Sequence, residues 1–146
     1  MKNMRCELCT KKHPNELWRD SLVYIIDASE TDVPGFVRVV LNEHIAEMSE
    51  LTAEQRTHIY DVINIVELAM REIMRPTKVN LAQFGNKVPH LHWHVIARFV
   101  DDAFFPGSVW SPRLRETPSE VLRQRQESAI RLFAILPEKL NAAFSL

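Results

Sequence analysis

Short blocks of apolar residues, separated by polar turns, run through the first 41 positions. They predict a β-hairpin over residues 16–27, with its turn at Asp20-Ser21. The polar segment SETDVPG at residues 29–35 predicts a loop, and the β-branched segment FVRVVL at residues 36–41 predicts the next strand.

The pattern then changes to a helical one. The segment SELTAE at residues 49–54 carries polar residues typical of a helix start, and apolar residues then recur every three or four positions to about Met74. Pro76 prevents the helix from continuing. The stripe expected to face the core consists of Ile59, Val62, Ile63, Val66, Ala69, Met70 and Ile73.

Two further strands follow, at residues 78–84 and 91–100, with a turn at Gly85-Asn86 between them. Residues 101–118 contain three prolines and are expected to be irregular. The order of strands, helix, strands and helix predicts an α+β fold, an antiparallel sheet of about five strands with helices on one face.

A second helix is predicted from Pro118-Ser119 to about Leu136. Pro137 is then expected to start a short last helix, because proline is tolerated in a first turn but not in a helix interior. The apolar positions of the second helix are Val121, Leu122, Ala129, Ile130, Leu132 and Phe133.

Composition limits the class of protein. The 146 residues are 46% hydrophobic and 25% charged, which is typical of one soluble domain. The formal net charge is −1, so no overall field attracts nucleic acid, and no nucleic-acid partner is expected. The three glycines are far apart, which excludes a glycine-rich phosphate loop or dinucleotide fingerprint, and no organic cofactor is expected.

No apolar run approaches the roughly 20 residues that span a bilayer, so no membrane association is expected. The first sixteen residues also lack the apolar stretch of a signal peptide, and we therefore expect a cytoplasmic protein. Thiols stay reduced in that compartment. The Cys-x-x-Cys pair, Cys6 and Cys9, then indicates metal ligands or a redox pair rather than a structural disulfide.

The strongest chemical signal is the alternation of His90, His92 and His94 with apolar residues. On a strand these three imidazoles would share one face. Such a face suits a three-histidine zinc site that activates water. It equally suits phosphoryl chemistry, in which a neutral imidazole attacks phosphorus. The spacing does not choose between the two.

The segment HLHWHVI, from His90 to Ile96, resembles the signature of the histidine triad (HIT) family of nucleotide hydrolases and transferases at all seven positions. The longer stretch KVNLAQFGNKVPHLHWHVIARF is similar to the family's asparagine-bearing strand, turn and triad strand. FVRVVLNEH, ending at His44, and FPGSVW downstream also resemble family segments. The resemblance implies a single HIT domain over residues 1–146, with an N-terminal arm at 1–15 and a C-terminal helical tail at 111–146.

The resemblance also implies roles. His92 would attack the α-phosphate of a purine nucleotide and form a nucleotidyl-histidine intermediate. His90 would orient the ring of His92 through its backbone carbonyl, and His94 would contact phosphate or the leaving group. Asn80 matches the asparagine that lines the phosphate site, and Asp27 matches the acidic residue that receives ribose hydroxyls.

Two positions depart from the nucleoside-phosphoramidase branch of the family. Lys87 replaces a serine that assists the leaving group, and Phe36 replaces a further histidine. A lysine could bind extra phosphate or protonate a leaving group, so Lys87 is a candidate substrate-binding residue. A dinucleoside polyphosphate thereby becomes an alternative to a phosphoramidate.

Some bacterial members of the family carry a Cys-x-x-Cys that binds structural zinc. The resemblance implies the same role for Cys6, Cys9, His44 and His90, and two thiolates with two imidazoles suit a closed tetrahedral site. The alternative is an unbound cysteine pair in a loose arm. A thioredoxin-like role is not expected, because the pair does not lie between a strand and a helix.

We therefore expect a nucleotide-binding hydrolase or nucleotidyl transferase that forms a homodimer, as HIT proteins commonly do. The alternatives are a nucleotide- or partner-binding module with little turnover, and a three-histidine zinc hydrolase. Outside the motif, Arg98 is expected to form a surface ion pair, although it could reach phosphate. His58 is expected on the surface, and Trp18 and Trp93 in the core.

Overall fold

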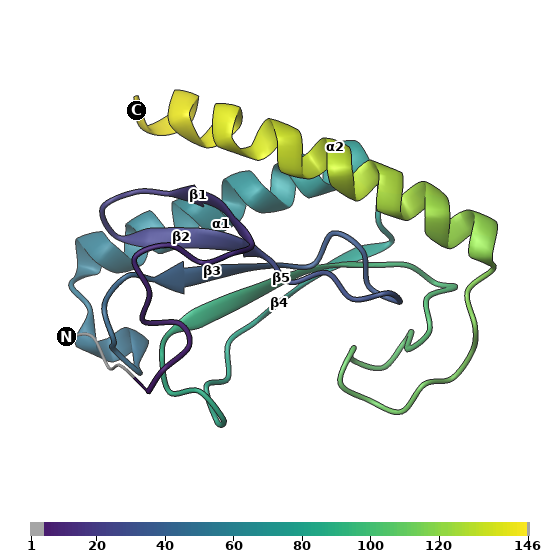
Figure 1. Cartoon of the computed structure of the whole chain (residues 1–146), viewed down its shortest axis with the longest axis horizontal. Coiled ribbons are helices and arrows are strands. Elements are labelled where there is room, and N and C mark those ends of the chain that lie inside the picture. The colour runs from purple at the N-terminus through teal and green to yellow at the C-terminus, as the bar shows by residue number, and fades with distance from the viewer. Residues whose placement is uncertain (1–4, 146) are drawn as a thin grey trace.

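The computed structural model describes residues 5–145, and these form a five-stranded antiparallel sheet with two long helices on one face (Figure 1). The strands lie side by side in the order β1-β2-β3-β5-β4, and a 3-10 turn, Met48–Glu50, precedes the first helix. This arrangement confirms the predicted α+β fold. The strand bounds are Glu16–Arg19 (β1), Val23–Asp27 (β2), Val37–Leu41 (β3), Lys78–Ala82 (β4) and His92–Arg98 (β5).

Helix α1, Ala53–Met74, has a hydrogen-bonded cap at its start and a left-handed residue at its end. The side chain of Thr52 accepts a hydrogen bond from the Gln55 backbone, and the Gln55 side chain accepts one from the Thr52 backbone. At the other end Arg75 adopts a left-handed conformation with φ 51°, and Pro76 follows.

Helix α2, Ser119–Phe144, corrects the prediction of two separate helices, because it continues through Pro137. Proline has no N–H and removes one helical hydrogen bond. Leu132, Leu136 and Leu140 are nevertheless fully buried in one stripe, and their contacts with the core hold both sides of the proline in one helix. Among the apolar positions named for this helix, Ile130 is 67% exposed and lies outside the buried stripe.

The strands around the histidine motif are shorter than predicted. Strand β5 begins at His92 and ends at Arg98, instead of spanning residues 91–100. The backbone of Leu91 still bonds to two neighbours, donating to Ile45 and accepting from Leu41, but it lies outside the regular ladder. Strand β4 ends at Ala82 because the chain turns away before the triad.

The two faces of the sheet have different roles. Alternate residues such as Val39 and Val95 point into the main core between the sheet and the helices. The opposite face carries Tyr24, Ile26 and Val40, and Leu8 of the N-terminal arm packs against them. The functional side chains described below lie on this second face, which the helices do not cover.

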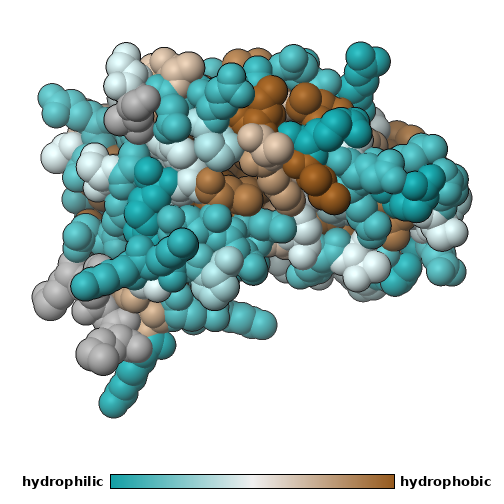
Figure 2. Space-filling view, turned by 45° about the horizontal axis from the view of Figure 1, so that its top comes forward, coloured by the Kyte–Doolittle hydropathy of each residue, from teal (hydrophilic) through white to brown (hydrophobic). Residues whose placement is uncertain are grey.

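The surface is mostly hydrophilic. With its upper side turned towards the viewer, the molecule shows apolar side chains gathered in one patch near the middle, surrounded by polar ones (Figure 2). No helix among residues 5–145 combines the length and the apolar character needed to cross a membrane.

Candidate functional site

The structure divides the three motif histidines into two groups. His92 and His94 point from β5 into a cavity, with ring centroids 5.0 Å apart. The ring of His90, which precedes the strand, lies against His44 instead, at 5.2 Å. Within residues 5–145, His90 but neither His92 nor His94 joins a cluster of converging metal-ligand atoms. The fold therefore does not assemble the three-histidine zinc site.

His92 is held in one tautomer by the chain itself. Its Nδ1 lies 2.6 Å from the backbone carbonyl oxygen of His90, so Nδ1–H donates and Nε2 keeps its lone pair. Burial lowers the pKa of His92, and the positive charge of Arg38 lowers it further, against the opposing effect of the carbonyl. The imidazole is therefore neutral at pH 7, as a nucleophile requires.

His94 is also kept neutral. Burial, followed by the charges of His92 and Arg38, lowers the pKa of His94 to about 4. Arg38, on β3 directly opposite His94, donates from Nε to Nδ1 of His94 at 3.4 Å. This contact leaves the proton of His94 on Nε2, so the ring is a hydrogen-bond donor on its other side.

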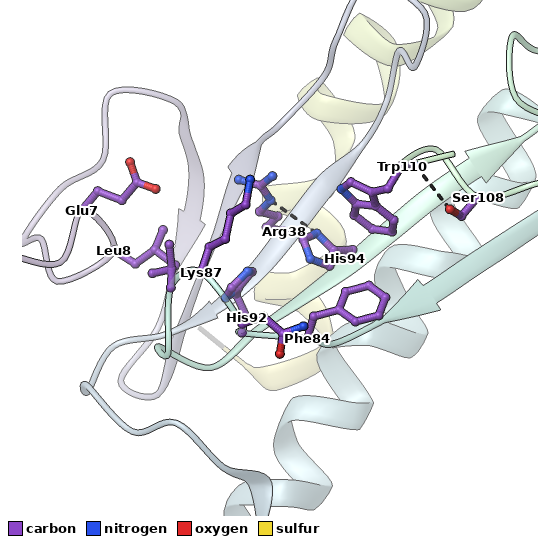
Figure 3. Close-up of a pocket in the computed structure, with 12 residues that line it drawn as sticks. Glu7, Leu8, Arg38, Phe84, Lys87, His92, His94, Ser108 and Trp110 are labelled. Atoms are coloured by element: carbon purple, nitrogen blue, oxygen red, sulfur yellow. Dashed lines mark hydrogen bonds between the residues drawn. The ribbon is translucent and has the colours of Figure 1, made fainter. Parts of the chain in front are cut away.

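The cavity in front of these two rings has a volume of about 410 Å³ (Figure 3). Its other walls come from four parts of the chain that are distant in sequence: the arm, strand β3, the segment between β4 and β5, and the loop that follows β5. Phe84 and Trp110 form an aromatic edge beside His94, with centroids 6.1 Å and 4.9 Å from its ring. Lys87, which was predicted to bind substrate, lines the same cavity.

Asp27 lies in a neighbouring cavity of about 280 Å³ at the end of β2. One of its carboxylate oxygens accepts a hydrogen bond from the Ser29 backbone at 2.8 Å, which fixes the carboxylate at the cavity wall. Arg38, Glu7 and Leu8 line both cavities, so the two adjoin. A ligand that occupies both could therefore contact Asp27 and the histidines together.

Asn80 lies on the same sheet face as His94, but it does not line either cavity. Its Oδ1 accepts a hydrogen bond of 2.8 Å from Nη1 of Arg98. With the oxygen engaged in this way, the NH2 group of Asn80 is the part left to donate to a ligand.

Arg98 corrects the expectation of a surface ion pair, since only 2% of it is exposed. Its guanidinium bonds to Asp102 at 2.8 and 3.1 Å and to the carbonyl oxygen of Gly107 at 2.7 Å. These bonds tie the loop after β5 to the sheet. They also occupy the guanidinium, so Arg98 does not face the cavity as a phosphate ligand. His58 is partly exposed and lies 2.5 Å from Asp20, a partner that the sequence did not indicate.

Four side chains form a separate cluster behind the cavity. Their ligand atoms all lie within 4.8 Å of one another. His90 Nδ1 lies 3.6 Å from Cys6 Sγ, 3.3 Å from Cys9 Sγ and 3.3 Å from His44 Nδ1, and Cys9 Sγ lies 3.2 Å from His44 Nδ1. Around tetrahedral zinc, neighbouring sulfur and nitrogen donors would lie about 3.3–3.8 Å apart. The cluster thus has the donor set and the spacing of such a site.

The hydrogen bonds around the cluster leave its ligand atoms free to bind a cation. His90 Nε2 lies 2.6 Å from the carbonyl oxygen of Leu41, so Nε2–H donates there and Nδ1 offers its lone pair to a metal. Burial raises the pKa of the Cys6 thiol, and Cys9 raises it further. A bound divalent cation would reverse that effect and hold the thiolate.

The arm reaches the cluster because its first turn is fixed to the sheet. The hydroxyl of Tyr24 donates to the carbonyl oxygen of Leu8 at 2.6 Å, and the backbone of Cys9 donates to that of Cys6. Leu8, which lies between the two cysteines in the sequence, is buried against the sheet. The hydrophobic contact therefore brings both thiols to the same place.

Sequence reasoning missed two residues of the site, Arg38 and Phe84. Arg38 did leave a signal, because it is a charged residue inside the apolar segment FVRVVL. Arg38 lies two residues from both Phe36 and Val40, so the three side chains share one face of the strand. This is the face that points away from the helices. Phe84 and Trp110 belong to irregular segments, whose course the sequence does not specify.

The chain is similar to proteins of one known family. The HIT domain family matches residues 11–101. Among solved structures, a histidine triad protein from Bradyrhizobium japonicum is 26% identical, with a TM-score of 0.64 over 81% of this chain and 89% of that one. A histidine triad protein from Marinobacter aquaeolei is 27% identical, with a TM-score of 0.64 over 83% and 89%.

A zinc-bound histidine triad family protein from Mycobacterium smegmatis shares the fold. It is 19% identical, with a TM-score of 0.56 over 90% of this chain and 97% of that one. No curated protein matches the chain.

Proposed function

Because the chain belongs to the histidine triad (HIT) family, we propose that it binds a purine nucleotide and transfers the nucleoside monophosphate to His92. The observation that carries the proposal is the hydrogen bond between His92 Nδ1 and the His90 carbonyl. It leaves a neutral imidazole with its Nε2 lone pair in a cavity large enough for part of a nucleotide.

In the proposed reaction, Nε2 of His92 forms a bond to the α-phosphorus as the bond to the leaving group breaks. Water then attacks the same phosphorus, and His92 departs as a neutral imidazole. A phosphate leaving group departs as an anion. An amine leaving group takes up a proton from solvent water, and the proton of the attacking water returns to solvent. We assign to the Nε2–H of His94 a hydrogen bond to a phosphate oxygen. Asp27 would accept the ribose hydroxyls. Asn80 lines neither cavity, and its part would be to hold the guanidinium of Arg98 through Oδ1.

Mixing the protein with an adenosine phosphoramidate and recording its intact mass tests the proposal. Native protein should gain one adenylyl group or turn the substrate over rapidly. His92→Ala and His92→Gln should do neither. His58→Gln, a histidine of helix α1 outside both cavities, is the matched control and should keep the activity. Bound nucleotide without adduct or turnover would instead identify a binding module.

We also propose that Cys6, Cys9, His44 and His90 hold a structural zinc ion. The proposal is supported by the donor set and the spacing of the four ligand atoms. Zinc would fasten the arm to the sheet and fix His90, whose carbonyl orients His92. It would act on structure and take no part in the bond changes. Reduced thiols are required, which agrees with a cytoplasmic location.

A homodimer is proposed on the basis of the β4 edge. This strand pairs with β5 on one side only, and the exposed apolar residue Leu81 lies on it. Such an edge favours pairing with another chain. Sedimentation velocity at micromolar concentration should give a species of twice the chain mass, and a single species at chain mass would refute the dimer.

A further inference from the structure

Two cationic side chains reach the histidine cavity from different elements. Arg38 comes from the middle of β3, and Lys87 comes from the segment that precedes β5. Figure 3 shows both extending towards the region above His92. Among residues 5–145, neither forms an ion pair with a carboxylate, although Glu7 lines the same cavity.

Arg38 is the more informative of the two because it is half-buried. Its neighbours are the ring of His94, to which it donates at 3.4 Å, and the ring of Phe36, whose centroid lies 5.5 Å from the guanidinium carbon. These contacts are with neutral groups. Removing a guanidinium from water without an anionic partner is unfavourable, so the position favours a ligand that brings negative charge.

The charge of the two cations can be compared with that of each substrate class. A nucleoside phosphoramidate brings a single phosphate group to the cavity. A dinucleoside polyphosphate brings several phosphate groups joined in a chain. Arg38 and Lys87 together therefore match at least two phosphate groups. Arg98 cannot share this role, because Asp102 already holds it.

We propose that Arg38 and Lys87 form a subsite for a phosphate group next to the one that His92 attacks. The inference rests on the proposed nucleotidyl transfer and adds a preference: the substrate carries a phosphoanhydride-linked leaving group. Arg38 supplies a planar fork that can bind two oxygens of one phosphate. Lys87 supplies a movable point charge on the exposed side of the cavity.

The test compares two substrates that share the same adenosine monophosphate part, adenosine phosphoramidate and diadenosine tetraphosphate. The value of kcat/KM is measured for native protein, Arg38→Gln, Lys87→Gln and the double variant. Each single substitution should lower kcat/KM for the tetraphosphate by about 10- to 100-fold, the effect of losing a charged hydrogen bond. The loss for the phosphoramidate should be smaller, because only the tetraphosphate places a phosphate group in the subsite, so the ratio of the two kcat/KM values should fall in each variant.

Arg123→Gln is the matched control, because it removes one positive charge from the exposed face of α2. It should leave both values unchanged. Arg38→Lys should recover part of the loss for the tetraphosphate, which separates a role of charge from a folding defect. An equal loss for both substrates, or no loss for either, overturns the subsite, because Arg38 would then act through His94 or not at all.

Direct binding separates this inference from the proposed function. If native protein turns over neither substrate, nucleotidyl transfer has failed as an assignment, and the subsite is tested alone by calorimetry with inorganic tripolyphosphate. Binding to native protein that is lost in the Arg38→Gln, Lys87→Gln double variant supports the subsite. Absence of binding to native protein, or equal binding to both proteins, overturns it.

Discussion

Replacing Arg98 by Met should destabilise the fold strongly, because it leaves a carboxylate buried without its cation. Arg98 is 2% exposed and Asp102 is 6% exposed. The substitution removes two bonds to Asp102 and one each to Asn80 and Gly107. Breaking a buried pair by removing one partner costs roughly 3–5 kcal/mol of unfolding free energy. We expect a loss in that range at pH 7.

The loss should depend on pH in a defined direction. Burial alone would raise the pKa of Asp102, but the bonds from Arg98 and from the backbone of Phe99 and Phe104 outweigh it, and the net pKa is lowered. A carboxyl with a lowered pKa in the folded state contributes stability above its unfolded pKa, near 3.8, and loses it as the pH falls through the folded value. The difference between native and variant should therefore narrow below about pH 4.

Urea unfolding followed by circular dichroism at pH 7 and pH 3.5 measures both quantities. Arg123→Met is the control, since its partners Glu120 and Glu127 are exposed and its loss should have little effect. A loss under about 1 kcal/mol for Arg98→Met at pH 7 would refute the reasoning, because the loop after β5 would then be held by something other than this pair.

Two further predictions concern the cluster and the triad. Cys9→Ser should reduce bound zinc from one per chain to none by atomic absorption and lower the melting temperature, and a variant that keeps one zinc would contradict the assigned ligands. His94 should titrate near pH 4 by NMR; because its folded pKa lies below the unfolded value near 6.5, stability should fall by roughly 3 kcal/mol as the pH drops from 6.5 to 4. His94→Gln should reduce that slope, and an unchanged slope would count against the neutral buried imidazole.

The strands and helices were largely predictable, because each carries a regular period of apolar residues. The helix from residue 53 to Met74 has both a capping signal and a single stripe, and both ends agree with the structure. The exception is instructive. Pro137 predicts a break from local propensity, but the burial of Leu136 and Leu140 on one stripe outweighs a single lost hydrogen bond.

The site was predictable only where residues follow strand alternation or a family motif. His92 and His94 share a face as alternation requires, whereas the ring of His90 turns to the cysteines because the strand has not yet begun. Arg98 could not be placed, because its partner Asp102 lies on an irregular loop. The course of such loops depends on tertiary contacts rather than on a local period.

Helix α2 has a consequence for the time at which the protein can fold. The sheet is complete once Arg98 has been synthesised, but 46 more residues must be added up to and including Phe144, the last residue of the helix. Until then the apolar positions that α2 covers on α1 and the sheet are open to water. At translation speeds of about 5–20 residues per second, this interval lasts on the order of a few seconds. During this interval part of the core is uncovered, and the exposed apolar surface is open to aggregation.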